Sequence, residues 1–164
     1  MKSNLVMDFS VDRENSKINV KREFAAPLAR VWAAWTQPEL LDQWWAPKPW
    51  KARTKSMDFT EGGRWLYAMV GPEGEEHWSF AEYKKIIPQK SFTGLDGFSD
   101  SEGNINTDLP SAEWQTNFSA SEDHTMVDIS ITYENLADLE QFLQMGFKEG
   151  FTMGLENLDE LLEK

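Results

Sequence analysis

The two histidines of the sequence, His77 and His124, are the first candidates for acid–base or metal chemistry. A zinc site built on histidine ligands would need both imidazoles to converge. His124, however, follows Asp123 in a segment with the composition of a hairpin turn. The sequence contains no cysteine, which excludes disulfides, thiolate nucleophiles and thiolate metal ligands. We therefore expect no metal site and no cofactor.

His77 could act as a general base if a neighbouring carboxylate oriented its imidazole, and Glu75 and Glu76 precede it. Adjacent residues of a β-strand face opposite sides of the sheet, so Glu76 and His77 do not point the same way. We therefore favour a solvent-facing histidine on a strand over a catalytic base.

Arg22 and Glu82 each fall within the otherwise apolar frame of a predicted strand. A charge held in such a frame needs a partner, because burying it alone is costly. We expect each of them to form a structural pair between an arginine and a carboxylate, rather than to anchor a ligand.

The segment 96–110 carries Asp100, Glu102 and Asp108 around Gly103. This spacing differs from that of an EF-hand calcium loop, so we expect a solvated hairpin loop, long enough to act as a lid over one end of the fold. The sequence also lacks the motifs of nucleotide-binding loops, serine hydrolases and zinc peptidases.

The composition is that of one folded domain, which we place at residues 1–164. Eight tryptophans, ten phenylalanines and three tyrosines in 164 residues can build a substantial core. The formal net charge of −12, without a run of lysine or arginine, argues against nucleic acids and anionic membranes as partners. No signal-like or membrane-spanning apolar run is present, so we expect a cytoplasmic protein.

Hydrophobic periodicity predicts a strand, two short helices, five or six further strands and one long C-terminal helix. Pro27 opens the first helix, and Thr36 with Glu39 forms a capping box for the second, which ends near Trp44 and Trp45. The predicted strands are Lys17–Phe24, with a start that could lie upstream near Asp8, Trp50–Phe59, Arg64–Val70, Glu75–Ile87, Ser91–Leu95, Glu113–Ser121 and Thr125–Tyr133. Tight turns between consecutive strands indicate an antiparallel sheet.

The C-terminal helix is predicted from Leu136 to Leu162, with Asn135 as its N-cap. Gly146, Gly150 and Gly154 recur on its apolar side at four-residue spacing. Each glycine inside a helix costs about 1 kcal/mol relative to alanine, so three of them need a physical reason. Two reasons stay open, namely close backbone packing and space left for a cavity.

Alternation along three strands gathers aromatic side chains on what we take to be the inner face of the sheet. These sets are Trp65, Tyr67 and Met69, then Trp78, Phe80 and Glu82, and finally Trp114, Thr116 and Phe118. Trp44 and Trp45 are neighbours and cannot both point inward, so one of them should lie at a cavity mouth or on the surface. Aromatic walls of this kind describe either a filled core or a small-molecule site.

Several spaced motifs in the sequence resemble one known family. They are Phe24–Pro27, Val31–Glu39, Trp44–Pro47, Gly62–Trp65, Gly71–Gly74 and Met145–Thr152. Together they are similar to the START-like (SRPBCC) superfamily, and within it to bacterial homologues of the C-terminal domain of the activator of heat-shock protein 90 ATPase. The resemblance spans residues 17–162. It implies an α+β helix-grip fold, in which a curved antiparallel sheet wraps around a long C-terminal helix.

The resemblance also implies a cavity between the sheet and that helix, and we expect non-catalytic binding of a small apolar or amphipathic molecule there. The expected ligand-binding residues are Trp45, Trp65, Tyr67, Met69, Trp78, Phe80, Glu82, Trp114, Phe118, Phe147, Gly150, Phe151 and Gly154. Two alternatives stay open. One is a co-chaperone-like module of the stress response that binds a chaperone or another protein, and the other is a cyclase- or hydrolase-type enzyme that uses His77, Glu82 or Tyr67.

Overall fold

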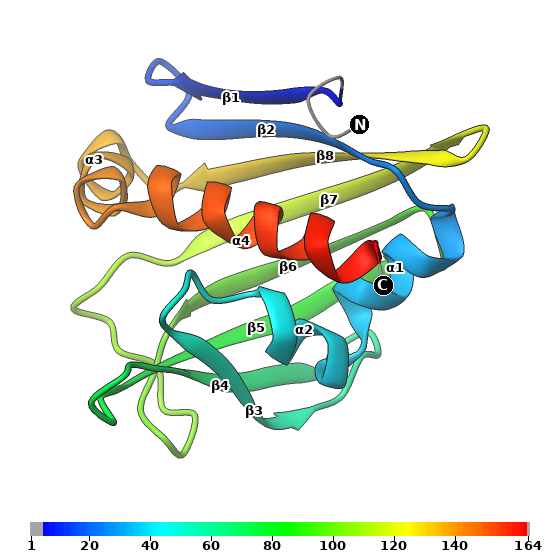
Figure 1. Ribbon diagram of the computed structural model, residues 1–164. Coiled ribbons are helices and arrows are strands. Elements are labelled where there is room, and N and C mark those ends of the chain that lie inside the picture. The colour runs from blue at the N-terminus through cyan, green and yellow to red at the C-terminus, as the bar shows by residue number, and fades with distance from the viewer. Residues whose placement is uncertain (1–4, 164) are drawn as a thin grey trace.

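The body of the protein is one antiparallel sheet of eight strands that curves around a helix (Figure 1). The computed structural model describes residues 5–163. The strands are β1 (Met7–Asp12), β2 (Lys17–Phe24), β3 (Lys51–Met57), β4 (Arg64–Val70), β5 (Glu76–Ile87), β6 (Ser91–Phe98), β7 (Ala112–Ser121) and β8 (His124–Tyr133). The helices are α1 (Leu28–Thr36), α2 (Pro38–Trp44), α3 (Leu136–Gln144) and α4 (Phe147–Leu162). This architecture confirms the predicted α+β helix-grip fold.

The sheet runs in the order β1-β2-β8-β7-β6-β5-β4-β3, and α4 crosses its concave face (Figure 1). The chain enters the sheet at the edge strand β1, forms β2 beside it, and then leaves the sheet for α1 and α2, which return it to the opposite edge at β3. Helix α2 packs against both β3 and α4. The concave side is therefore closed by helices at the β3 end as well as along α4.

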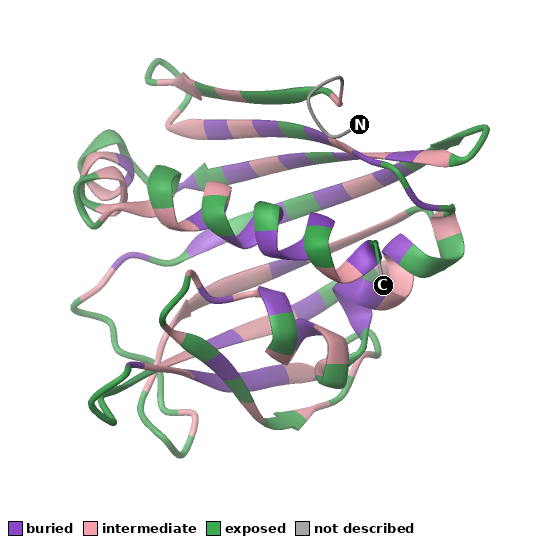
Figure 2. Cartoon of the chain, viewed as in Figure 1, coloured by how far each residue is buried: buried purple, intermediate pink, exposed green. Residues whose placement is uncertain are grey.

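Alternation of buried residues explains why α4 packs on β2 and β8. Ile18 and Val20 of β2 and Ile129 of β8 are fully buried. Along each strand, the intervening residues on the other face are less buried (Figure 2). They belong to one hydrophobic cluster with Leu155 and Leu158 of α4. A strand with one apolar face and a helix with one apolar stripe bury these surfaces against each other.

Arg22 lies in the buried frame of β2 and pairs with Asp159 of α4. The guanidinium also lies 4.9 Å from the ring of Phe24 and donates a hydrogen bond to the carbonyl of Glu23. Both side chains of the pair are less than a tenth exposed, so each charge depends on the other. The expected structural pair at Arg22 is thus present, and it fixes α4 to β2.

Two local predictions near the N-terminus are wrong. The strand upstream of Lys17 is a separate one, because a turn in which Asp12 accepts hydrogen bonds from Asn15 reverses the chain between β1 and β2. Thr36 does not cap α2, because its hydroxyl donates to the carbonyl of Trp32 one turn earlier. Helix α2 begins at Pro38 without a side-chain cap.

The single long C-terminal helix of the prediction is two helices in the structure. Asn135 caps α3 as predicted, and its side chain accepts a hydrogen bond from the N–H of Asp138. Helix α3 then ends at Gln144, and Gly146 has a left-handed backbone with φ of 90°. Glycine adopts this conformation without steric cost, and it commonly ends a helix. The apolar spacing continues across the break, which is why periodicity alone predicts one helix.

The other two helical glycines have different packing reasons. A Cβ atom at Gly154 would lie 3.4 Å from the carbonyl oxygens of both Trp44 and Trp45, so this residue permits close contact with the end of α2. A Cβ atom at Gly150 would meet only the Pro47 side chain, at 3.7 Å. Gly154 therefore serves backbone packing, whereas Gly150 leaves room.

The middle of the loop between β6 and β7 folds against the convex face of the sheet and does not cover the concave one. Arg64 of β4 donates to the carbonyl of Gly103 at 2.8 Å, and Lys55 of β3 donates to the carbonyl of Ser101 at 2.6 Å. The carboxylate of Asp100 accepts hydrogen bonds from the backbone and side chain of Asn104 and so shapes the loop itself. The acidic residues of this loop are thus part of a solvated turn.

Candidate ligand cavity

The concave face carries one row of side chains that crosses five strands. Strand register pairs Trp65 with Ala81, Ala81 with Asp96, Asp96 with Ala112 and Ala112 with Tyr133. Alternate residues of a strand share a face, and directly opposed residues of paired strands share it too. Asp96 is therefore flanked on both sides by alanines, which leave its carboxyl open to the space above the sheet.

That space is an outer chamber with a volume of about 210 Å³. Its floor includes Tyr67, Met69, His77, Ser79, Asp96, Phe98, Ala112, Trp114 and Tyr133 from the sheet. Its roof includes Phe142, Met145 and Gly146 from α3 and the segment after it, Phe147, Gly150 and Phe151 from α4, and Trp45 and Pro47 from the segment after α2. The missing side chain of Gly150 contributes directly to its volume.

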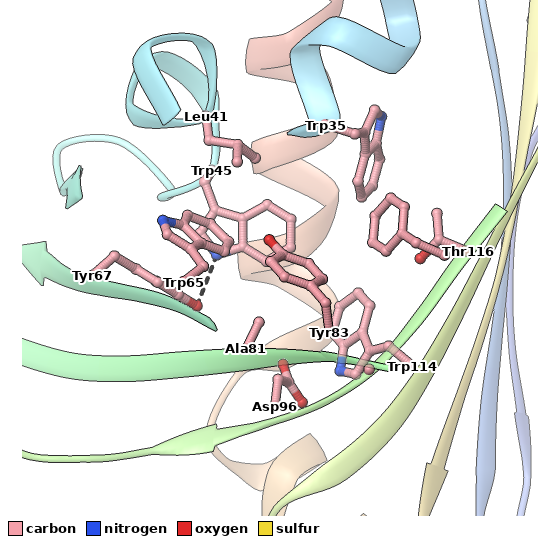
Figure 3. Close-up of a pocket in the computed structure, with 12 residues that line it drawn as sticks. Trp35, Leu41, Trp45, Trp65, Tyr67, Ala81, Tyr83, Asp96, Trp114 and Thr116 are labelled. Atoms are coloured by element: carbon pink, nitrogen blue, oxygen red, sulfur yellow. Dashed lines mark hydrogen bonds between the residues drawn. The ribbon is translucent and has the colours of Figure 1, made fainter. Parts of the chain in front are cut away.

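A smaller inner chamber of about 50 Å³ continues the space toward α1. Its walls are aromatic and include Trp35, Trp65, Tyr83 and Phe92, as Figure 3 shows for the labelled residues. The two chambers share Trp45, Tyr67, Asp96 and Trp114. We call the two chambers together the cavity, and these four residues form its middle.

Trp45 divides the cavity and is held in place by a hydrogen bond. Its indole nitrogen donates to the hydroxyl of Tyr67 at 2.9 Å (Figure 3). Its ring packs edge-on against Trp65 and Phe151, with centroids 5.5 and 6.0 Å away. Trp44 is turned into the core, with 1% exposure. The two adjacent tryptophans thus point different ways, and Trp45 is the one at the cavity.

Asp96 is the carboxyl group of the cavity, and its surroundings favour the neutral form. Burial raises its pKa to about 8, and the nearby indole of Trp114 opposes this rise only in part. The carboxyl and the indole nitrogen face each other in Figure 3. Within residues 5–163, no lysine or arginine lines either chamber and no ion pair involves Asp96.

Four buried polar atoms of the described residues have no hydrogen-bond partner of normal geometry. They are the indole nitrogens of Trp35 and Trp114 and the hydroxyl oxygens of Thr116 and Tyr133. All four residues line the cavity. Buried polar groups are normally paired, so their concentration at one place marks this cavity as a site for polar as well as apolar contacts.

The tyrosines of the cavity remain neutral acids. Burial is the main cause that raises the pKa of Tyr67 and of Tyr133, and the negative charge of an ionised Asp96 adds to both effects. Burial also raises the pKa of Tyr83. These hydroxyls therefore act as hydrogen-bonding groups.

Eight of the thirteen residues predicted for the site line the cavity. They are Trp45, Trp65, Tyr67, Met69, Trp114, Phe147, Gly150 and Phe151. Phe118 and Gly154 lie beside it without lining it, because Phe118 packs against Trp32 and Trp35 while Gly154 contacts the end of α2.

The placement of Trp78, Phe80 and Glu82 on the inner face is wrong. The register of β4 and β5 pairs Tyr67 with Ser79, so Ser79 and Ala81 face the cavity and the residues between them face outward. Phe80 is nevertheless fully buried, because the convex face carries its own apolar layer, with the guanidinium of Arg64 5.0 Å from its ring centroid.

Glu82 pairs with Arg64 on that convex face, at 3.0 Å. The expected structural pair at Glu82 is thus present, but the enzyme alternative loses this residue as a cavity acid. Trp78 lies near the cationic groups of Arg53 and Lys55, each 5.8 Å from its ring. These contacts belong to the outer surface of the sheet.

Sequence reasoning missed Asp96 and Tyr133 as cavity residues, and it placed His77 there only in the enzyme alternative. The predicted strand Ser91–Leu95 ends one residue before Asp96, which was placed in the loop 96–110, whereas β6 continues to Phe98. The alternation of Phe92, Gly94 and Asp96 was the available signal, since Gly94 and Asp96 face the same side as the inward residues of β5.

The two histidines have separate surroundings. His77 is exposed at the outer chamber and its ring lies 5.2 Å from that of Trp50. His124 lies 3.2 Å from the carboxylate of Glu23 at the start of β8. Among residues 5–163, no three histidine or acidic side chains are arranged to hold a metal ion.

Comparison with known proteins identifies relatives over nearly the whole chain. The family described as Activator of Hsp90 ATPase homolog 1-like protein matches residues 25–163. Protein Ms6760 from Mycobacterium smegmatis is 33% identical, with a TM-score of 0.88 and 96% of each chain covered. No protein with a curated description has significant sequence similarity to the chain.

Two solution structures are also similar. A protein from Arthrobacter aurescens is 29% identical, with a TM-score of 0.90 and coverage of 95% of this chain and 91% of that one. A protein from Staphylococcus epidermidis is 28% identical, with a TM-score of 0.82 and coverage of 94% and 93%. Within the described residues, no helix combines the length and apolar character needed to span a bilayer.

Proposed function

Because this chain belongs to the START-like family of Activator of Hsp90 ATPase homolog 1-like proteins, we propose that it binds a small amphipathic molecule in the cavity between the sheet and α4. The observation that carries the proposal is the coincidence of an open space with unpaired polar atoms. Trp114 and Tyr133 line the outer chamber, and each carries one such atom. A ligand that pairs with them removes a desolvation cost that the free protein bears.

The size of the cavity limits the ligand class. An apolar cavity of about 150 Å³ in another protein accommodates benzene, and the outer chamber here measures about 210 Å³. Drug-sized ligands occupy pockets of roughly 300–1,000 Å³. We therefore propose ligands with one or two rings, or of similar bulk.

The lining favours binding over catalysis. Tyr67 is engaged with Trp45, and Glu82 lies on the other face of the sheet. Of the acid–base groups considered from the sequence, His77 remains at the exposed end of the outer chamber. Acid–base catalysis needs catalytic groups that lie together around one reacting atom. Tyr67, Glu82 and His77 do not form such a group.

Ala112→Leu tests the proposal, because the larger side chain projects into the outer chamber beside Asp96. We expect small aromatic probes to change the tryptophan emission of the wild type and to lose this effect in the variant. Ala120→Leu is the matched control, since Ala120 lies exposed on the same strand. Equal probe affinity in both variants and the wild type would place binding outside the cavity and contradict the proposal.

A second candidate function follows from the family description, which names activation of a chaperone ATPase. Such an activity would use the outer surface, so it should be the same in the wild type and in Ala112→Leu. An ATPase assay with a purified chaperone of the Hsp90 class checks this, and absence of stimulation by either protein rules the candidate out.

A further inference from the structure

The cavity combines aromatic walls with a single carboxyl group at its centre. Eight of the nineteen residues around the outer chamber are tryptophan, tyrosine or phenylalanine: Trp45, Tyr67, Phe98, Trp114, Tyr133, Phe142, Phe147 and Phe151. Asp96 lies among them and also lines the inner chamber. The electron-rich faces of aromatic rings attract cations, and cages of such rings recognise quaternary ammonium groups.

We propose that the ligand of this cavity is an organic cation, an amine or quaternary ammonium compound with a small aromatic or alkyl body, whose positive group lies against Asp96. This inference rests on the proposed binding function and names the class of ligand. The apolar body would occupy the remainder of the outer chamber, between the sheet and α4.

The packing around Asp96 leaves access for a bulky cationic group. Ala81 and Ala112 flank it across the sheet, and Gly94 precedes it on the same face of β6. Above this floor, Gly150 replaces a side chain with open space. Small residues therefore flank Asp96 along the floor of the cavity, and the ring of Trp114 faces its carboxyl.

A bound cation is also compatible with a hydrogen bond from Trp114 to Asp96. The indole nitrogen of Trp114 faces the Asp96 carboxyl (Figure 3) but has no acceptor of normal geometry. When Asp96 is ionised, one carboxylate oxygen can accept from Trp114 and the other can face the cation. The proton of Asp96 leaves to solvent in this step, and the pair in the cavity then carries no net charge.

Anionic and neutral ligands fit the site less well. Within residues 5–163, no lysine or arginine lines the cavity to neutralise an anion, and the net charge of −12 disfavours the approach of one. A neutral ligand of the same shape would fill the space but leave the carboxyl without a charged partner.

Other titratable groups face the same space. Tyr67, Tyr83 and Tyr133 surround Asp96 from β4, β5 and β8, and His77 lies at the exposed end on β5. The three residues that α4 contributes, Phe147, Gly150 and Phe151, do not titrate. The effect of Asp96 on binding must therefore be separated from that of His77.

Phenyltrimethylammonium and its neutral carbon isostere, tert-butylbenzene, form the decisive pair of probes. We expect the wild type to bind the cation about tenfold more tightly or better, as measured by tryptophan emission and thermal shift. In Asp96→Asn, which keeps the size of the side chain, this preference should disappear while the neutral probe still binds.

Equal or tighter binding of tert-butylbenzene by the wild type would overturn the inference and leave the proposed binding function intact. If the wild type binds neither probe, both the cation inference and the proposed binding function are contradicted. The result does not depend on the folding of Asp96→Asn alone, because the pH profile of the wild type gives an independent answer.

The quaternary probe does not titrate, so any pH dependence of its affinity comes from the protein. Burial raises the pKa of Asp96 to about 8, and the cation requires the ionised form. Below that pH, the wild-type affinity should rise about tenfold per pH unit and then level off. His77→Gln should retain this profile; a flat wild-type profile, or one abolished by His77→Gln, would contradict the role of Asp96.

Discussion

At the scale of single residues, the chemistry of the cavity depends on where Asp96 lies. Its neighbours across the sheet are Ala81 and Ala112, which offer it no hydrogen bond from their side chains. The aromatic walls of the cavity limit the water that can solvate its carboxylate, so the charged form is disfavoured. Burial thus favours the protonated form of Asp96 in the free protein, and a cationic ligand would favour the ionised form.

The raised pKa of Asp96 predicts a specific dependence of stability on pH. The unfolded chain loses this proton near the ordinary pKa of 3.8, whereas the folded protein holds it up to about 8. Between these values the folded state binds more protons, so the contribution of Asp96 to the free energy of unfolding falls as pH rises.

Asp96→Asn removes this dependence. The free energy of unfolding of the variant relative to the wild type should therefore increase from about pH 4 to about pH 8 and stay constant above that. Urea denaturation of both proteins across this range is the measurement. A difference that does not change with pH would show that Asp96 ionises normally in the folded protein.

At the scale of elements, alternation predicted which residues share a face but not which face looks inward. Trp78, Phe80 and Glu82 do lie together on β5. A period of two carries no information on the direction of the face, and the usual guide, burial of aromatics, fails here because the loop between β6 and β7 packs near the convex side. The direction of this face of β5 therefore depends on contacts between segments that are distant in the sequence.

The same limit applies to the ends of elements. Asp96 and Gly97 have the composition of a turn, but β6 continues because β5 and β7 supply partners on both sides. Gly146 interrupts the C-terminal helix although the apolar spacing continues past it. The fold class, the six strands β3 to β8 and eight cavity residues could be predicted from the sequence. The separate strand β1, the break between α3 and α4 and the position of Asp96 could not be predicted from local patterns.

Two glycines of α4 should respond oppositely to the same substitution. Gly154→Leu would push a side chain against the carbonyl oxygens of Trp44 and Trp45, and we expect it to lower the free energy of unfolding by about 1–3 kcal/mol. Gly150→Leu projects into the outer chamber, so it should preserve stability, or raise it through the better helix propensity of leucine, and abolish ligand binding.

Chemical denaturation of the two variants, together with the probe titrations, checks this pair. Each is the other's control, because the two positions are one helical turn apart on α4. Greater destabilisation by Gly150→Leu than by Gly154→Leu would mean that the space at Gly150 cannot receive a side chain.

At the scale of the whole molecule, apolar burial is divided between the two faces of one sheet. The convex face is filled, since Leu66, Ala68 and Phe80 are all buried there. The concave face packs tightly along β2 and β8 but leaves the cavity over β4 to β7. Gly154 lets α4 pack closely against the end of α2, which closes the cavity on that side. The open space is thus a consequence of how the elements constrain one another.

A ligand that occupies this space should stabilise the entire fold, because α4, the segment after α2 and five strands all contact it. At a hundredfold excess over its dissociation constant, a ligand specific for the folded state contributes about 2.7 kcal/mol. For a domain of this size, that corresponds to a rise in Tm of about 5–10 °C. Differential scanning calorimetry with phenyltrimethylammonium measures this shift in the wild type and in Gly150→Leu. The variant should show no shift because its leucine fills the outer chamber, and an equal shift in both proteins would place the probe at another site.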